Sequence, residues 1–236
     1  MKKNLALLLI LFQLFFLKAD DSKLKLNIYR SKSHEDQTGS LTPLVISLSS
    51  DDVKEKTTNA DLIFVVDISG SMSGTRLKLV KETLNYIVDI TNENDNIALI
   101  TFESYAHKIM GLTKMTEANK NTMRAKINAL SVTGGTNIYV GLEMGLQQII
   151  KDYTSGDRVC SIIMLSDGYD NYQNADTRFA NLVNNGAKKN YIFTTHVFGY
   201  GQSHDAVLMN KISLIRDGMF FAIKEFTQVK SAFIKI

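Results

Sequence analysis

Residues 62–73 constrain the fold of this chain more than any other segment. They begin with an apolar, β-branched run of strand length, Leu62 to Val66, which ends at Asp67. Ser69 and Ser71 follow at alternate positions. A buried strand therefore delivers oxygen ligands to its own carboxyl end. In open α/β sheets, that end is the edge at which ligands bind.

Strand-like and helical patterns alternate after residue 59, which is typical of a parallel sheet covered by helices on both faces. The expected strands are 62–66, 97–102, 107–112, 158–166, 191–198 and 219–223, and the expected helices are 76–91, 116–130, 138–153, a helix across 179–183, 206–216 and 225–236. The short strand 107–112 is expected at an edge, where it can run antiparallel. We therefore predict an α/β fold with a doubly wound, mostly parallel six-stranded sheet, which is Rossmann-like.

The first 19 residues resemble a secretory signal peptide. Lys2 and Lys3 precede a nearly unbroken apolar run from Leu5 to Leu17, and Ala19 is a small residue at a suitable cleavage position. The run is short for a membrane span. We therefore expect cleavage and a secreted, extracellular protein of the secretory pathway, with an uncleaved N-terminal membrane anchor as the alternative.

Residues 20–59 are predicted to form an N-terminal extension that is rich in β-structure. Two short alternating segments, 24–29 and 44–48, indicate strands joined by a polar loop, and a solvated linker follows at 51–59. The domain organisation expected from the sequence is thus a signal peptide at 1–19, the extension at 20–59 and one α/β domain at 60–236.

The net positive charge of the chain comes from the predicted signal peptide, residues 1–19. The formal net charge is +3, and removal of residues 1–19 takes away three lysines and no acid, which leaves a net charge of zero. A neutral domain without a basic tract argues against nucleic acid or an anionic membrane as a partner. The one cysteine, Cys160, lies in an apolar strand pattern and cannot form an internal disulfide, so we expect an inert, buried thiol.

Three loops at the carboxyl edge of the predicted sheet carry oxygen ligands. The first offers Asp67, Ser69 and Ser71, the second offers Thr136 after two glycines, and the third offers Asp167. Hydroxyls and carboxylates without cysteine or histidine suit a hard cation such as Mg²⁺, with Mn²⁺ or Ca²⁺ as alternatives. With few direct carboxylate ligands the ion stays electrophilic, which leaves a position open for an acidic group of a partner.

These residues resemble a known binding site. Asp67-x-Ser69-x-Ser71, Thr136 in Gly-Gly-Thr-Asn, and Asp167 in Leu-Ser-Asp-Gly are similar in order and spacing to the metal-ion-dependent adhesion site (MIDAS) of von Willebrand factor type A domains, also called integrin I-type domains. The resemblance covers residues 60–236. It implies that the two serines and, in the ligand-bound form, Thr136 coordinate the metal directly, whereas both aspartates act mainly through waters or by supporting the direct ligands from behind. It also implies that a partner's Asp or Glu fills the open metal position and that the last helix can shift upon binding.

We predict a non-enzymatic, metal-dependent protein-binding module whose partner presents an exposed Asp or Glu; the sequence leaves its oligomeric state open. The alternatives are a metal-assisted phosphoester hydrolase and a scaffold subunit with a structural metal. Ser69 and Ser71 lack a Gly-x-Ser-x-Gly elbow and a histidine base, and a single cysteine cannot build a RING-type metal cluster. Tyr169 and Tyr172, on the loop beside Asp167, are either partner anchors or part of the loop packing.

Overall fold

The computed structural model describes residues 58–152, 158–185, 191–201 and 204–233, together with the backbone of 24–30 and 44–50. The chain divides into two compact units, residues 1–57 and 58–236. In the first unit, β1 (Leu24–Arg30) and β2 (Leu44–Ser50) pair as an antiparallel hairpin, which confirms the two short strands predicted there. The predicted signal peptide, its cleavage position and most of the linker lie outside the described residues.

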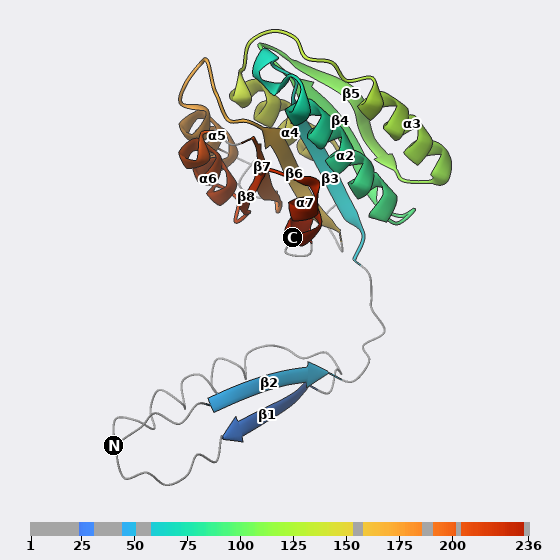
Figure 1. Ribbon diagram of the computed structural model, residues 1–236, viewed down its shortest axis with the longest axis vertical. Helices are drawn as coiled ribbons and strands as arrows, with labels where there is room; N and C mark the ends of the chain where they lie inside the picture. The colour runs from blue at the N-terminus through green and yellow to red at the C-terminus, as the bar shows by residue number, and fades with distance from the viewer. Residues whose placement is uncertain are drawn as a thin grey trace. The chain divides into compact units, whose positions relative to one another are not determined.

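The second unit is built on a six-stranded sheet in the order β5-β4-β3-β6-β7-β8 (Figure 1). All neighbouring strands are parallel except β4 and β5, so the predicted sheet and its antiparallel edge strand are confirmed. The strands are β3 (Ala60–Asp67), β4 (Asn96–Phe102), β5 (Ala106–Lys114), β6 (Val159–Ser166), β7 (Thr194–Tyr200) and β8 (Phe220–Ile223). Strand β7 begins three residues later than predicted, because Ile192 is exposed and strand pairing starts at Thr194.

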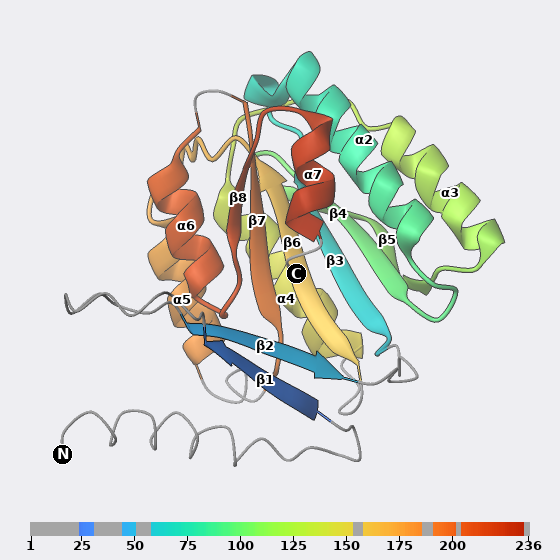
Figure 2. The ribbon, with the colours of Figure 1, turned by 60° about the horizontal axis from the view of Figure 1, so that its bottom comes forward.

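Helices cover both faces of this sheet (Figure 2). One face carries α2 (Thr75–Ile90), α3 (Glu117–Asn128) and α7 (Phe226–Phe233), and the other carries α4 (Ile138–Asp152), α5 (Ala175–Asn184) and α6 (Ala206–Leu214); a 3-10 turn, η1 (Gly70–Met72), precedes α2. Alternate residues of β3 divide between the two cores: Phe64 and Val66 face the α2 side, and Ile63 and Val65 face the α4 side. A strand buried on both faces must be apolar throughout, which explains its sequence.

The order of the strands places a topological switch point between β3 and β6. From β3 the chain passes through α2 to β4 on one side, whereas β6 lies on the other side of β3. Connections therefore diverge at this junction, and such a switch point is where open α/β sheets bind ligands. The register pairs Val66 with Leu165, so that Asp67 and Ser166 stand next to each other at the two strand ends.

Helix α4 packs against the sheet through a glycine. A Cβ atom on Gly141 would lie 2.6 Å from the Phe102 ring, which is closer than real Cβ atoms approach, and 3.0 Å from Val65 Cγ1, which is a tight contact. Helix α4 directly follows the second oxygen-bearing loop. The close packing of this helix against the sheet therefore also fixes the position of the loop's carboxyl end.

Replacement of Gly141 by valine is expected to destabilise the domain by about 2 kcal/mol or more, because the added methyl groups must displace the Phe102 ring from a packed core. The matched control is Gly111→Val in β5, where a Cβ atom would meet only the side chain of Gln148 at 3.8 Å. Urea titration gives the free energy of unfolding for both variants. Equal stability of the two variants would contradict this account of the packing.

Candidate metal centre

Asp67 is fully buried, and both of its carboxylate oxygens accept hydrogen bonds. Its side chain has no exposed surface. Its Oδ1 accepts the backbone N–H of Ser69 at 2.8 Å, and its Oδ2 accepts the hydroxyl of Ser166 at 2.5 Å. Burial raises the pKa of Asp67 from 3.8 to about 6, although the hydrogen bonds from Ser166 and Ser69 oppose that rise. The carboxylate is therefore held rigidly at the end of β3, with a neutral donor on each oxygen.

The two serines of the first loop bring their hydroxyls together. Ser69 Oγ and Ser71 Oγ lie 3.1 Å apart. Ser69 is buried and Ser71 is exposed, so the pair runs from the interior to the surface. The 3-10 turn η1 sets this arrangement, because its buried Met72 anchors the turn and donates its N–H to the carbonyl of Ser69 at 3.0 Å.

The second loop, residues 131–137, lies along the first. The N–H of Thr133 donates to the carbonyl of Ile68 at 2.7 Å, and the N–H of Gly70 donates to the carbonyl of Gly134 at 3.3 Å. Gly134 has a φ of +61°, and a Cβ atom there would collide with the carboxylate of Glu103. Only glycine combines this backbone conformation with this close approach.

Glu103 is an acid near the site that the sequence patterns did not single out. It is buried to 9% exposure below the Gly134 turn, and its carboxylate accepts the backbone N–H of the adjacent Ser104. Burial pushes the pKa of Glu103 up, but hydrogen bonds from Ser104 and the backbone of Tyr105 outweigh burial and lower the pKa overall. Glu103 is consequently a charged support under the second loop.

Thr136 is held in place by the third loop, residues 167–174. Its N–H donates to Asn171 Oδ1 at 2.7 Å, and its carbonyl accepts the N–H of Asn171 at 2.9 Å. Next to this contact, Asp170 Oδ1 accepts the N–H of Ile138 at 3.3 Å, at the first residue of α4. The acid Asp170 is thus engaged at a helix start, a role that its position after a strand did not reveal.

Asp167 at the end of β6 has no exposed surface. Arg76, from the first turn of α2, places its Nη1 atom 3.1 Å from Asp167 Oδ2 and 2.6 Å from the carbonyl of Ser71. Gly168, with a φ of +79°, turns the chain away directly afterwards. The guanidinium therefore joins the first loop to the third.

The five residues predicted from the sequence stand on three loops at one edge of the sheet. Contacts connect Asp67 to Ser69, Ser69 to Ser71, and the Ser71 backbone through an arginine to Asp167. Thr136 is tied in through its backbone. Sequence reasoning missed the residues that support this set, namely Arg76, Glu103, Ser166 and Asn171.

The chemistry of these donors fits a hard cation. Across the described residues there is no group of three or more His, Cys, Asp or Glu that could hold a metal ion. The candidate centre instead combines two buried carboxylates with three hydroxyls, all of them oxygen donors. Oxygen donors without nitrogen or sulfur suit Mg²⁺, Mn²⁺ or Ca²⁺.

A catalytic reading of the serines lacks a base in the part of the chain that the structure describes. The hydroxyls of Ser69 and Ser71 bond to each other, and no described histidine lies within hydrogen-bond distance of either. His107 contacts Glu103, and the ring of His196 accepts the N–H of Met219. A Ser-His arrangement for nucleophilic catalysis is therefore not formed by these residues.

Curated relatives match this chain over most of its length. The chain is 28% identical over 185 residues to the uncharacterized protein YfbK of Escherichia coli, covering 78% of this chain and 32% of that protein. It is 30% identical over 176 residues to inter-alpha-trypsin inhibitor heavy chain H1 of Bos taurus, covering 72% of this chain and 19% of that protein. The chain thus spans a third or less of the length of these two relatives.

Solved structures share the fold. A von Willebrand factor type A protein from Catenulispora acidiphila superposes with a TM-score of 0.65 at 19% identity, covering 81% of this chain and 44% of that one. Proximal thread matrix protein 1 from the mussel byssus, with a zinc-occupied MIDAS motif, superposes with a TM-score of 0.59 at 21% identity, covering 75% and 44%.

The family model for the von Willebrand factor type A domain matches residues 61–234, which is most of the chain and the whole of the α/β unit apart from its ends. The fold, with its parallel sheet and one antiparallel edge strand, agrees with this match. The chain belongs to the von Willebrand factor type A domain family.

Proposed function

We propose that this protein is a non-enzymatic binding module that presents a divalent cation to an exposed Asp or Glu of a partner protein. Mg²⁺ is the proposed ion, with Mn²⁺ and Ca²⁺ as alternatives. The observation that carries the proposal is the pair of hydroxyls, Ser69 and Ser71, 3.1 Å apart beside two carboxylates without exposed surface, Asp67 and Asp167.

The contacts of each side chain suggest its role. Ser69, Ser71 and Thr136 would hold the ion with their hydroxyls. Asp67 would act through neighbouring groups, because both of its oxygens already accept hydrogen bonds, and Asp167 would contribute charge from the end of β6. When bound, the ion supplies an electrophilic position for a carboxylate. Hydroxyl ligands leave that electrophilicity largely intact, since they carry no charge of their own.

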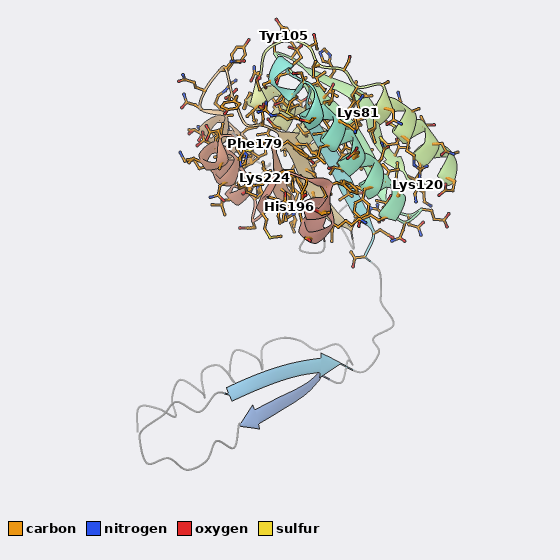
Figure 3. All side chains as sticks on the ribbon, in the orientation of Figure 1. Lys81, Tyr105, Lys120, Phe179, His196 and Lys224 are labelled. Atoms are coloured by element: carbon orange, nitrogen blue, oxygen red, sulfur yellow. The ribbon has the colours of Figure 1, made fainter. Side chains whose placement is uncertain are left out.

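Exposed tyrosines lie on the loops that follow β4 and β6 and support a protein as the partner. Tyr105 follows β4 and is 71% exposed, and Figure 3 shows it at the outer tip of the domain. Tyr169 and Tyr172 on the third loop are 46% and 55% exposed. Of the two interpretations that the sequence left open for these two tyrosines, their exposure favours anchors for a partner over loop packing, because tyrosine is enriched among residues that dominate binding energy.

We propose a signal peptide at 1–19, an extension at 20–59 and the binding domain at 60–236, and hence a location in the secretory pathway or outside the cell; a tether through an uncleaved N-terminal segment is the alternative. None of the helices in the described residues is long and apolar enough to cross a membrane.

The two kinds of relative support this function in different ways. The bovine relative is named as a heavy chain of inter-alpha-trypsin inhibitor, which supports a role in protein association for this chain. The mussel protein carries zinc in its MIDAS motif, which supports a metal at the equivalent edge of this sheet but not the choice of ion.

The affinity for Mg²⁺ should depend on pH through Asp67. Because burial raises the pKa of Asp67 to about 6, the carboxyl is protonated below that pH, and it must lose its proton before it can contribute negative charge to the bound ion. The dissociation constant should therefore be constant between pH 7 and 8 and rise about tenfold for each pH unit below 6. Isothermal titration calorimetry at a series of pH values measures this.

The metal-free protein should respond in the opposite direction. Since the folded-state pKa of Asp67 lies above its ordinary value of 3.8, the free energy of unfolding of the metal-free protein should fall as pH rises from about 4 to about 6.

In the variant Asp67→Asn, Mg²⁺ affinity should be weaker and should lose its pH dependence below pH 6. A wild-type affinity that is independent of pH, or no heat with any divalent ion, would contradict the proposed centre.

The proposed partner chemistry can be tested with a random peptide library displayed on phage, selected in Mg²⁺ and eluted with chelator. The recovered peptides should share an Asp or Glu and should lose binding in chelator. Tyr172→Ala should weaken the selected peptides by about tenfold, whereas Ile90→Ala, which removes an exposed apolar side chain at the far end of α2, should not. Peptides that bind equally in chelator would contradict a metal-dependent function.

A further inference from the structure

Arg76 contacts the candidate centre from an element that carries none of the proposed ligands. Its Nη1 atom lies 3.1 Å from Asp167 Oδ2 and 2.6 Å from the carbonyl of Ser71. Among the described residues, this guanidinium is the cation that forms an ion pair with Asp167. The positive charge of Arg76 is thus paired with the Asp167 carboxylate, whose proposed role is to neutralise a metal ion.

The position of Arg76 is built into the fold. Gly201 follows β7 with a φ of +99°, and a Cβ atom there would lie 2.6 Å from Arg76 Nε. A side chain at position 201 would consequently displace the guanidinium. The Arg76 side chain is 26% exposed, whereas that of Asp167 is not exposed at all, so the arginine reaches inward from the rim to a buried carboxylate.

Arg76 and a divalent metal ion would compete electrostatically for the carboxylate of Asp167. A buried carboxylate without a counter-charge is costly, and the pair with Arg76 reduces that cost when no ion is present. A divalent cation near the same carboxylate repels the guanidinium across a few ångströms of partly dehydrated protein. Loading the ion must therefore weaken the contact between Arg76 and Asp167, which lowers the net gain from binding.

We propose that Arg76 is an internal counter-ion that stands in for the metal in the unloaded protein and thereby sets the affinity for the divalent ion. This inference rests on the proposed metal centre and adds a determinant of its affinity. In the unloaded protein, Arg76 holds the first and third loops together through Ser71 and Asp167. In the loaded protein the ion takes over the neutralisation of Asp167, and the guanidinium is released toward the exposed rim.

The test compares Arg76→Met with wild type in two measurements. Calorimetric titration with MgCl₂ should show binding about fivefold tighter in the variant, the size expected for a partly exposed charge. Thermal unfolding in chelator should show a melting temperature lower by a few degrees. At saturating MgCl₂ this loss of stability should shrink. Expressed as free energies of unfolding, the loss in chelator minus the loss in MgCl₂ must equal the gain in the free energy of Mg²⁺ binding.

The control is Arg124→Met, which removes an arginine that pairs with Asp89 between α3 and α2. It should change neither the Mg²⁺ affinity nor the effect of Mg²⁺ on the melting temperature. Arg76→Lys keeps one charge but cannot reproduce the planar fork, so its affinity should lie between wild type and Arg76→Met. This second variant keeps the test valid if Arg76→Met does not fold.

The outcomes separate this inference from the proposed function. Unchanged Mg²⁺ binding in Arg76→Met, with equal destabilisation in chelator and in Mg²⁺, would show that Arg76 is only a structural clamp. Weaker Mg²⁺ binding, with a larger destabilisation in Mg²⁺ than in chelator, would show that Arg76 supports the ion. Either result would overturn the inference, while the metal centre stands. No binding of Mg²⁺ by the wild-type protein would overturn the proposed function and, with it, the competition.

Discussion

The burial of two carboxylates at neighbouring strand ends is the constraint on which the rest of this site depends. Asp67 and Asp167 have no exposed surface, and the charge on Asp167 contributes to the raised pKa of Asp67. Such a pair persists in a fold only when other groups compensate for it. Ser166 and the Ser69 backbone supply donors to Asp67, and Arg76 supplies a positive charge to Asp167.

The hydrophobic core fixes where these charges lie. Strand β3 is buried on both faces, and its register with β6 leaves no freedom in the relative heights of their carboxyl ends. Two glycines then allow close packing around this edge. Gly134 lets the second loop lie against Glu103, and Gly141 lets helix α4 lie against the sheet. The apolar packing, which is costly to rearrange, thus positions the polar edge that the hydrogen bonds to Asp67 and the Arg76–Asp167 ion pair hold together.

The sequence predicted the fold and the loops well, because both depend on local patterns. A strand buried on both faces, such as β3, reads as an unbroken apolar run, and helices such as α2 show their periodicity directly. Strand β7 was predicted too early because apolar residues such as Ile192 also occur outside the sheet. The roles of Arg76 and Asn171 were missed, since each acts across loops that are distant in sequence and neither belongs to a local pattern. The ligand roles of the five predicted residues stay a prediction.

A crystal structure of the domain grown with MnCl₂ tests the central claim most directly, because Mn²⁺ is an octahedral, oxygen-seeking substitute for Mg²⁺ that gives an anomalous signal. We expect a single strong anomalous peak at the carboxyl ends of β3 and β6, from a manganese ion bound by the hydroxyls of Ser69 and Ser71, with Arg76 withdrawn from Asp167. A structure without a peak at this edge, or with the manganese held elsewhere, would contradict it.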